Sequence, residues 1–225
     1  MSKLTFSVVD VFAEQYAAAP QMTARLRIEE STGEPVHAIA LRCQVRIEPQ
    51  RRRYTADEES GLLDMFGTRD RWFDTLKPFM WMQCSAMVQG FTGITEVDLA
   101  MPCTYDFDVT WSKYLHALRE DNIPVVFLFS GTVFTRGVSG FGVEQVPWDC
   151  ESKYQIPVSV WKDMIDHYFP NSGWLRLSRD TIDTLAYYKS VRGLTTWEAT
   201  MESLLAKANT DELAAEADGV EKVET

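Results

Sequence analysis

Apolar and polar residues alternate with a period of two through much of the first half of this 225-residue chain. The alternation is regular in residues 22–29, 39–48 and 80–88, and a shorter run begins at Leu4. Successive side chains of an extended strand point to opposite faces, so this pattern predicts strands with one buried and one solvated face. A sheet of this kind must cover its apolar face with a second layer.

Two helices are predicted between the strands. The segment 55–67 opens with a capping box, in which Thr55 is the N-cap and Glu58 is the third helical residue. Residues 107–118 carry apolar side chains at spacings of three and four, which is typical of one face of a helix. The first half is therefore expected to consist of strands with two inserted helices.

The strand pattern ends in a predicted hairpin and then gives way to helical spacing. Residues 125–135 are apolar on both faces, which is typical of a central strand, and the glycines in 137–142 turn the chain toward a partner at 141–148. Further along, Ser178 and Thr195 are predicted N-caps of two later helices. The order predicts an α+β fold: an antiparallel β-sandwich or curved sheet with two inserted helices and a C-terminal helical segment.

Three parts are expected along the chain. Residues 1–150 should form the β-rich sandwich domain, and residues 151–208 a C-terminal helical segment packed on it. Residues 209–225 contain six acidic residues, one lysine and no aromatic residue, so this acidic tail is expected to be disordered.

Seven arginines fall between positions 25 and 53 of a chain whose formal net charge is -11. With the adjacent tyrosine they form the candidate binding site: Arg25, Arg27, Arg42, Arg46, Arg51, Arg52, Arg53 and Tyr54. Residues 31–35 have turn chemistry, so the two strands that carry four of the arginines are expected to be neighbours with a shared basic face. Such a face would attract an anion or an acidic protein surface. The alternative is a solvated sheet face on which nearby glutamates pair with the arginines.

Motifs for catalysis or metal binding are weak. The chain has four cysteines: Cys43, Cys84, Cys103 and Cys150. No two of them form a C-x-x-C pair, so free thiols are expected rather than a zinc ribbon or an iron–sulfur cluster. A metal carrier or enzyme that uses Cys43, Cys103 or Cys150, or the helical pair Asp163 and His167, remains an alternative. The prediction is a non-catalytic protein without a resident cofactor or metal.

Charge and hydropathy restrict the partners. The acidic net charge argues against nucleic-acid binding, which requires a basic footprint. No segment reaches the ~18 consecutive apolar residues of a membrane span, and the first residues lack the apolar core and cleavage site of a secretory signal. We therefore expect a cytoplasmic protein that is not inserted in a membrane and that binds another protein.

Several segments together carry a resemblance to a known family. They are HAIALRCQVRIEPQRRRY at 37–54, FTG at 91–93, PCTYDF at 102–107, FSGTVF at 129–134 and QVPW at 145–148. Over roughly residues 3–205 the chain resembles an uncharacterised bacterial family, a domain of unknown function associated with uptake [NiFe]-hydrogenase gene clusters.

The resemblance implies a role beside a [NiFe] hydrogenase. The family has no established catalytic residues, so none are transferred to this chain. The implied function is that of an accessory or maturation factor, acting as a chaperone or by binding a hydrogenase subunit or another assembly protein. The contact would be the arginine face, joined by Tyr54 and Trp81. The alternative implied by the same setting is a structural subunit of a hydrogenase complex.

Overall fold

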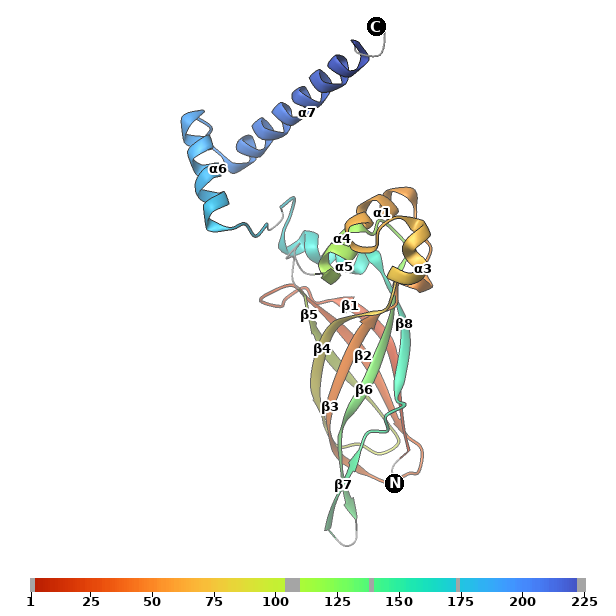
Figure 1. The fold of residues 1–225 in the computed structure, drawn as a ribbon. Helices are drawn as coiled ribbons and strands as arrows, with labels where there is room; N and C mark the ends of the chain where they lie inside the picture. The colour runs from red at the N-terminus through yellow and green to blue at the C-terminus, as the bar shows by residue number, and fades with distance from the viewer. Residues whose placement is uncertain (1–2, 104–109, 138–139, 173–174, 222–225) are drawn as a thin grey trace. The chain divides into compact units, whose positions relative to one another are not determined.

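The computed structural model describes residues 3–103, 110–137, 140–172 and 175–221 (Figure 1). They form two compact units, Met1–Leu175 and Arg176–Thr225. The first unit contains strands β1 to β8 and helices α1 to α5, and the second contains α6 and α7.

The strands of the first unit form two antiparallel sheets. The three-stranded sheet has the order β1-β2-β5, with bounds Leu4–Ala13, Gln21–Glu30 and Ile94–Pro102. The five-stranded sheet consists of β4 (Phe79–Val88), β3 (Val36–Ile47), β6 (Asn122–Gly137), β7 (Gly140–Gln145) and β8 (Glu151–Pro157). One edge of β6 pairs with β3, and the other pairs with β8 along its first half and with β7 along its second half. The predicted hairpin after residue 135 is therefore present, although residues 138–139 lie outside the described residues.

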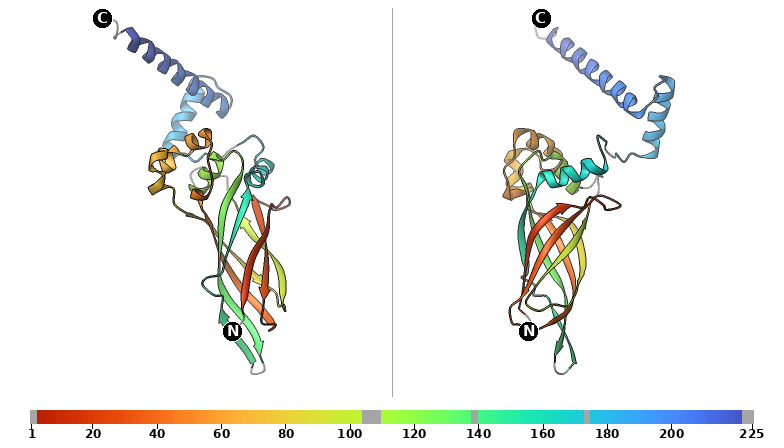
Figure 2. Two further views of the ribbon diagram at one scale, coloured as in Figure 1. Left: turned by 90° about the vertical axis from the view of Figure 1, so that its right-hand side faces the viewer. Right: turned by 180° about the vertical axis from the view of Figure 1, so that it is seen from behind.

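The inner faces of the two sheets meet and form the core (Figure 2). Phe6 of β1 stacks on Phe129 of β6 with ring centroids 4.7 Å apart, which joins the sheets across the interior. The inward residues predicted by the alternation, such as Leu26 and Val45, are fully buried. The predicted α+β class with an antiparallel sandwich is confirmed.

One predicted pairing is wrong. β2 pairs with β1 and β5, whereas β3 pairs with β4 and β6, so the turn at 31–35 connects two sheets and is not a hairpin. The buried carboxylate of Glu30 holds this turn, because it accepts hydrogen bonds from the N–H groups of Thr32 (3.0 Å) and Gly33 (2.8 Å). Turn chemistry predicts a reversal of the chain, but it does not determine which strands pair on either side of that reversal.

Short helices cover one end of the sandwich (Figures 1 and 2). Their bounds are η1 Pro49–Arg51, α1 Ala56–Gly61, α2 Leu63–Phe66, η2 Arg69–Arg71, α3 Trp72–Thr75, α4 Thr110–Ala117 and α5 Val158–Tyr168. The predicted capping box of Thr55 and Glu58 is confirmed at the start of α1. The helix predicted over 55–67 is split into α1 and α2, and Phe107, the predicted start of the α4 stripe, lies outside the described residues.

The first unit extends further than the sequence indicates. The sequence predicts a boundary after residue 150, and the two compact units of the structure divide after Leu175. β8 belongs to the first unit because it pairs with β6, and α5 belongs to it because Trp161 and Ile165 are buried in its core. The hydroxyl of Tyr168 at the end of α5 also donates to the carbonyl oxygen of Ala17 at 2.7 Å.

The second unit is a pair of helices, α6 (Arg179–Val191) and α7 (Trp197–Glu221). Ser178 caps α6 as predicted, since its hydroxyl accepts from the N–H of Thr181. α7 is capped by Thr196 rather than Thr195, because the Thr196 hydroxyl accepts from the N–H of Ala199 at 3.1 Å.

A side-chain hydrogen bond joins these two helices, between the hydroxyls of Tyr188 and Ser203 at 2.9 Å. α7 continues to Glu221, into the acidic segment 209–225 for which the composition predicts disorder. The disorder of residues 209–225 stays a prediction, to be tested by a measurement in solution.

Candidate binding site

The arginines of the predicted site lie on both sheets. Arg25 and Arg27 lie on the outer face of β2, in the three-stranded sheet. Arg42 and Arg46 lie on the outer face of β3, in the five-stranded sheet. Because the inner faces of the two sheets pack on each other, their outer faces point away from each other, and the four arginines do not share one basic face.

The two arginines of β2 are paired with acids on the neighbouring strand β5. The Nε of Arg25 lies 2.9 Å from Oδ1 of Asp98, and the Nη2 of Arg27 lies 3.4 Å from Oε1 of Glu96. In each case the acid stands directly opposite the arginine in the strand register. These are exposed cross-strand ion pairs, and they offset the charge of both arginines locally.

Glu48 pairs with two further arginines. Its side chain is 5% exposed, its Oε1 lies 3.1 Å from Nη2 of Arg46, and its Oε2 contacts Nε of Arg51. The alternative of local glutamate pairing therefore describes this part of the segment.

Arg52 belongs to a buried ion pair with Glu58. The two side chains are 3% and 1% exposed, and Nη2 of Arg52 donates to Oε1 of Glu58 at 2.8 Å. The same carboxylate accepts from the backbone N–H groups of Arg119 (2.7 Å) and Thr55 (3.1 Å). Burial alone would raise the pKa of Glu58, but these hydrogen bonds and the charge of Arg52 outweigh it and hold the pKa below its usual value. The pair ties α1 to the end of α4.

Tyr54 is part of the same structural cluster. Its hydroxyl donates to the carbonyl oxygen of Pro49 at 2.7 Å and lies 2.9 Å from the hydroxyl of Tyr114, while Arg52 lies over its ring. Burial raises the pKa of both phenols, that of Tyr114 to about 12. Trp81, expected beside this site, is 4% exposed and lies in the core. The geometry gives Arg52, Tyr54 and Trp81 structural contacts rather than an exposed surface.

Two arginines of the predicted site remain without a partner. Among the described residues, neither Arg42 nor Arg53 has an ion pair or a side-chain hydrogen bond, and both are exposed. Arg53 follows η1 in a connecting segment, whereas Arg42 lies in the middle of β3. Of these two arginines, only Arg42 has a neighbouring strand on each side, so the strand register fixes which residues lie beside it.

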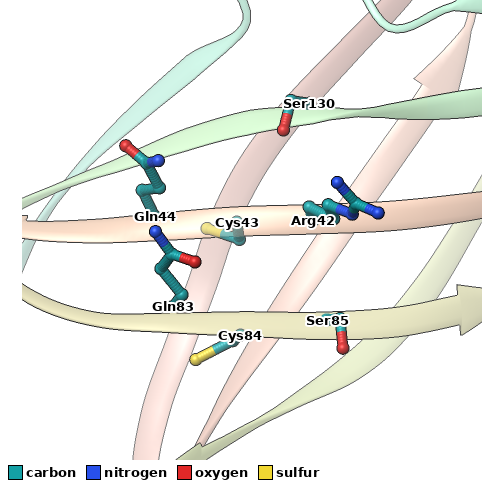
Figure 3. A pocket seen from close by; sticks show the side chains of 7 residues that line it. All are labelled: Arg42, Cys43, Gln44, Gln83, Cys84, Ser85 and Ser130. Atoms are coloured by element: carbon teal, nitrogen blue, oxygen red, sulfur yellow. The ribbon is translucent and has the colours of Figure 1, made fainter.

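Arg42 lies in a hollow of about 520 Å³ on the outer face of the five-stranded sheet (Figure 3). Ser85 of β4 and Ser130 of β6 stand directly opposite it on the two neighbouring strands, and Gln44 and Gln83 form the adjacent row. We name the outward residues of this region the β3–β4 strip: Ala40, Arg42, Gln44, Arg46, Met80, Gln83, Ser85 and Met87. The β3–β4 strip is polar in the middle and ends in a methionine at each end, of which Met80 is 55% exposed and Met87 is 61% exposed.

Of the thiols in the catalytic or metal-binding alternative, Cys43 is buried, and Cys103 and Cys150 are partly buried. Cys43 and Cys84 stand opposite each other on β3 and β4 and face the core, with 1% and 8% exposure. Burial raises the pKa of Cys43 strongly, that of Cys84 to about 11 and that of Cys103 to about 12. Nucleophiles and metal ligands need the thiolate, which this environment disfavours. Cys150 is only partly buried, and burial raises its pKa as well.

Within the described ranges, no group of three His, Cys, Asp or Glu side chains is placed to hold a metal ion. In the same ranges Asp163 and His167 form no ion pair with each other. The described helices include none that is both long enough and apolar enough to span a membrane.

Sequence reasoning did not identify Gln83, Ser85 and Ser130 as neighbours of Arg42. The alternation in residues 80–88 does place Gln83 and Ser85 on a solvated face. The missing information was the register between β3, β4 and β6, which joins residues more than forty positions apart.

The fold and the site define an α+β protein: an antiparallel sandwich closed at one end by short helices, with a polar hollow on one outer face. The chain belongs to the family of unknown function DUF6084, whose model matches residues 1–213. The expectation of an uncharacterised family is confirmed, and the match includes both compact units in large part.

Other comparisons add little. No curated protein matches the chain. A matching solved structure is the selenomethionine-labelled beta-glucosidase from Kluyveromyces marxianus, with 7% identity and a TM-score of 0.24. The match covers 68% of this chain and 15% of that one, and a TM-score this low supports no conclusion about fold or activity.

Proposed function

We propose that this protein is a non-catalytic accessory or maturation factor of a [NiFe] hydrogenase. In this proposal it acts in the cytoplasm by binding a hydrogenase subunit or another assembly protein. The hydrogenase setting comes from the family resemblance of the segments at 37–54, 91–93, 102–107, 129–134 and 145–148. The binding role comes from the surface chemistry of the first unit.

The observation that carries the binding role is the state of Arg42. Five of the seven arginines of its segment have acid partners within the molecule, namely Arg25, Arg27, Arg46, Arg51 and Arg52. Arg42 has no partner among the described residues. An unpaired arginine flanked by exposed methionines is typical of the residues that contribute most to protein interfaces. Methionine also adapts its shape to an irregular partner surface.

The proposal is tested by recovering the partner. The tagged full chain is captured anaerobically from its native host, and the co-purified proteins are identified by mass spectrometry. We expect a hydrogenase subunit or assembly protein, and we expect Arg42→Glu to reduce its recovery by about tenfold or more. Arg53→Glu is the matched control, because Arg53 is the other exposed arginine of residues 25–53 that has no ion-pair partner among the described residues. Recovery of the chain alone, or equal losses with both variants, would overturn the proposal.

A structural subunit is the second candidate, favoured by one observation on β7. This strand pairs with β6 along one edge, and its other edge has no strand partner among the described residues. Free strand edges can pair with another chain. Sedimentation of the purified chain as a concentration-dependent oligomer would support this role, and a monomer at all concentrations would refute self-association.

A further inference from the structure

The hollow around Arg42 offers several uncommitted hydrogen-bonding groups at one place (Figure 3). Neither the hydroxyls of Ser85 and Ser130 nor the amide of Gln44 makes a hydrogen bond to any described residue. The amide of Gln83 has only a 3.8 Å contact with the sulfur of Met80. Each of these side chains can donate to an acceptor placed over the sheet.

The charge around the hollow is positive although the whole chain is acidic. The outward residues of the β3–β4 strip include no aspartate or glutamate. The nearest carboxylate along β3 is Glu48, and it is already paired with Arg46 and Arg51. Glu151 of β8 lies on the same outer face and pairs with Lys153 at 3.2 Å. An acceptor at this place would therefore meet the charge of Arg42 beside acids that already have partners.

The number of available charges distinguishes between possible anions. Arg42 is the one cation of the β3–β4 strip that has no acid partner among the described residues, since Arg46 is held by Glu48. A single guanidinium matches one carboxylate, which it can bind through two parallel hydrogen bonds. A phosphoryl group carries nearly two charges and is usually bound by more than one cation or by a helix N-terminus, and neither is present in this hollow.

We propose that the hollow receives the carboxylate of an acidic side chain on the protein partner. The guanidinium of Arg42 binds the carboxylate, and the hydroxyls of Ser85 and Ser130, one on each side of Arg42, donate to its oxygens. The partner in this inference is the one in the proposed function, which the inference extends by naming the group that is recognised. The exposed methionines at the two ends of the β3–β4 strip then contact the apolar residues that flank the acid.

The test uses two short peptides that differ in one group. The ¹⁵N-labelled full chain is titrated with acetyl-Gly-Glu-Gly-amide and with acetyl-Gly-Gln-Gly-amide at equal ionic strength, and backbone amide shifts are followed by NMR. We expect saturable shifts at residues 42, 85 and 130 with the glutamate peptide and none with the glutamine peptide. Arg42→Gln should abolish them, Arg53→Gln should not, and Ser85→Ala or Ser130→Ala should weaken binding by about two- to tenfold.

Three results would overturn the inference. They are equal responses to the two peptides, shifts that never saturate, and tighter binding of inorganic phosphate than of the glutamate peptide. The outcome is separable from that of the proposed function. Peptide binding without recovery of a hydrogenase protein leaves the carboxylate site standing, whereas recovery of such a protein without peptide binding refutes only the site.

Discussion

Replacement of Glu58 by glutamine should destabilise the sandwich and its helical end far more than the same replacement of the adjacent Glu59. The Glu58 side chain is 1% exposed, and its carboxylate accepts from Arg52, Arg119 and Thr55. Glutamine keeps the size of the side chain but replaces one acceptor oxygen with a donor NH₂ group. One of the three donors then loses its acceptor, and the buried guanidinium of Arg52 loses its counter-charge.

The magnitude follows from the burial of the pair. Removing one partner of a buried ion pair costs about 3–5 kcal/mol, whereas an exposed pair contributes ~0–1 kcal/mol. The adjacent Glu59 provides the control, because it pairs with Arg69, whose side chain is 74% exposed. Glu58→Gln and Glu59→Gln change the net charge equally and lie in the same helix. We expect the first to lower the free energy of unfolding by about 3–5 kcal/mol and the second by less than about 1 kcal/mol.

The assay is urea unfolding of the full chain, followed by tryptophan fluorescence. The pH dependence gives a second readout. The folded-state pKa of Glu58 lies below its ordinary value of 4.5, so its stabilisation is present above that pH and is lost as the pH falls through the lower folded pKa. The difference between wild type and Glu58→Gln should therefore shrink in this acid range. Equal costs for the two glutamine variants at neutral pH would refute the reasoning.

Three further predictions use the same unfolding assay or a thiol titration. Burial lowers the pKa of the folded-state His116 imidazole from 6.5 to about 4. As the pH falls, the unfolded chain therefore takes up a proton at His116 before the folded chain does. The free energy of unfolding should fall by up to about 3 kcal/mol across this pH range, and by less to the extent that solvent screens the charge. His116→Gln should remove most of that dependence, and an equal acid dependence in the variant would contradict it. Gly131 has a φ of 143°, and a Cβ added there would lie 2.2 Å from the carbonyl oxygen of Ala40 in β3. Gly131→Ala should therefore lower the free energy of unfolding by about 2–5 kcal/mol. The control is Ser130→Ala at the exposed neighbouring position, which should lower it by less than about 0.5 kcal/mol. Cys43 is 1% exposed, so Ellman's reagent at pH 8 should modify its thiol far more slowly in the native chain than in urea. Peptide mapping measures the modification at Cys43 itself, and equal rates in the two conditions would show that the thiol is accessible.

Local patterns predicted the elements of the fold well. The alternation in residues 22–29 and 39–48 indicates which face of each strand is buried, because one face of a strand contacts the core and the other contacts water. The capping box of Thr55 and Glu58 was also readable, since its contacts lie three residues apart. By contrast, β8 was missed, because seven residues with a short alternation give a weak signal beside the helix that follows.

The candidate site required tertiary information. Arg25 and Arg42 look equivalent in the sequence, because each stands at a polar, outward position of an alternating strand pattern. Their difference comes from the opposite strand, where β5 places Asp98 against Arg25 and β4 places Ser85 against Arg42. Strand register is a long-range property, so no local pattern distinguishes a neutralised arginine from a free one.

The cross-strand ion pairs have a consequence for how sequences of this family diverge. A change of Arg25 leaves Asp98 without a counter-charge, so substitutions at these two positions should occur together among relatives, as should those at Arg27 and Glu96. Arg42 has no such intramolecular counterpart among the described residues. If contact with another protein maintains Arg42, substitutions at Arg42 should covary with substitutions in that protein. Comparing the two sequences across the genomes of relatives should then identify the residues that contact Arg42.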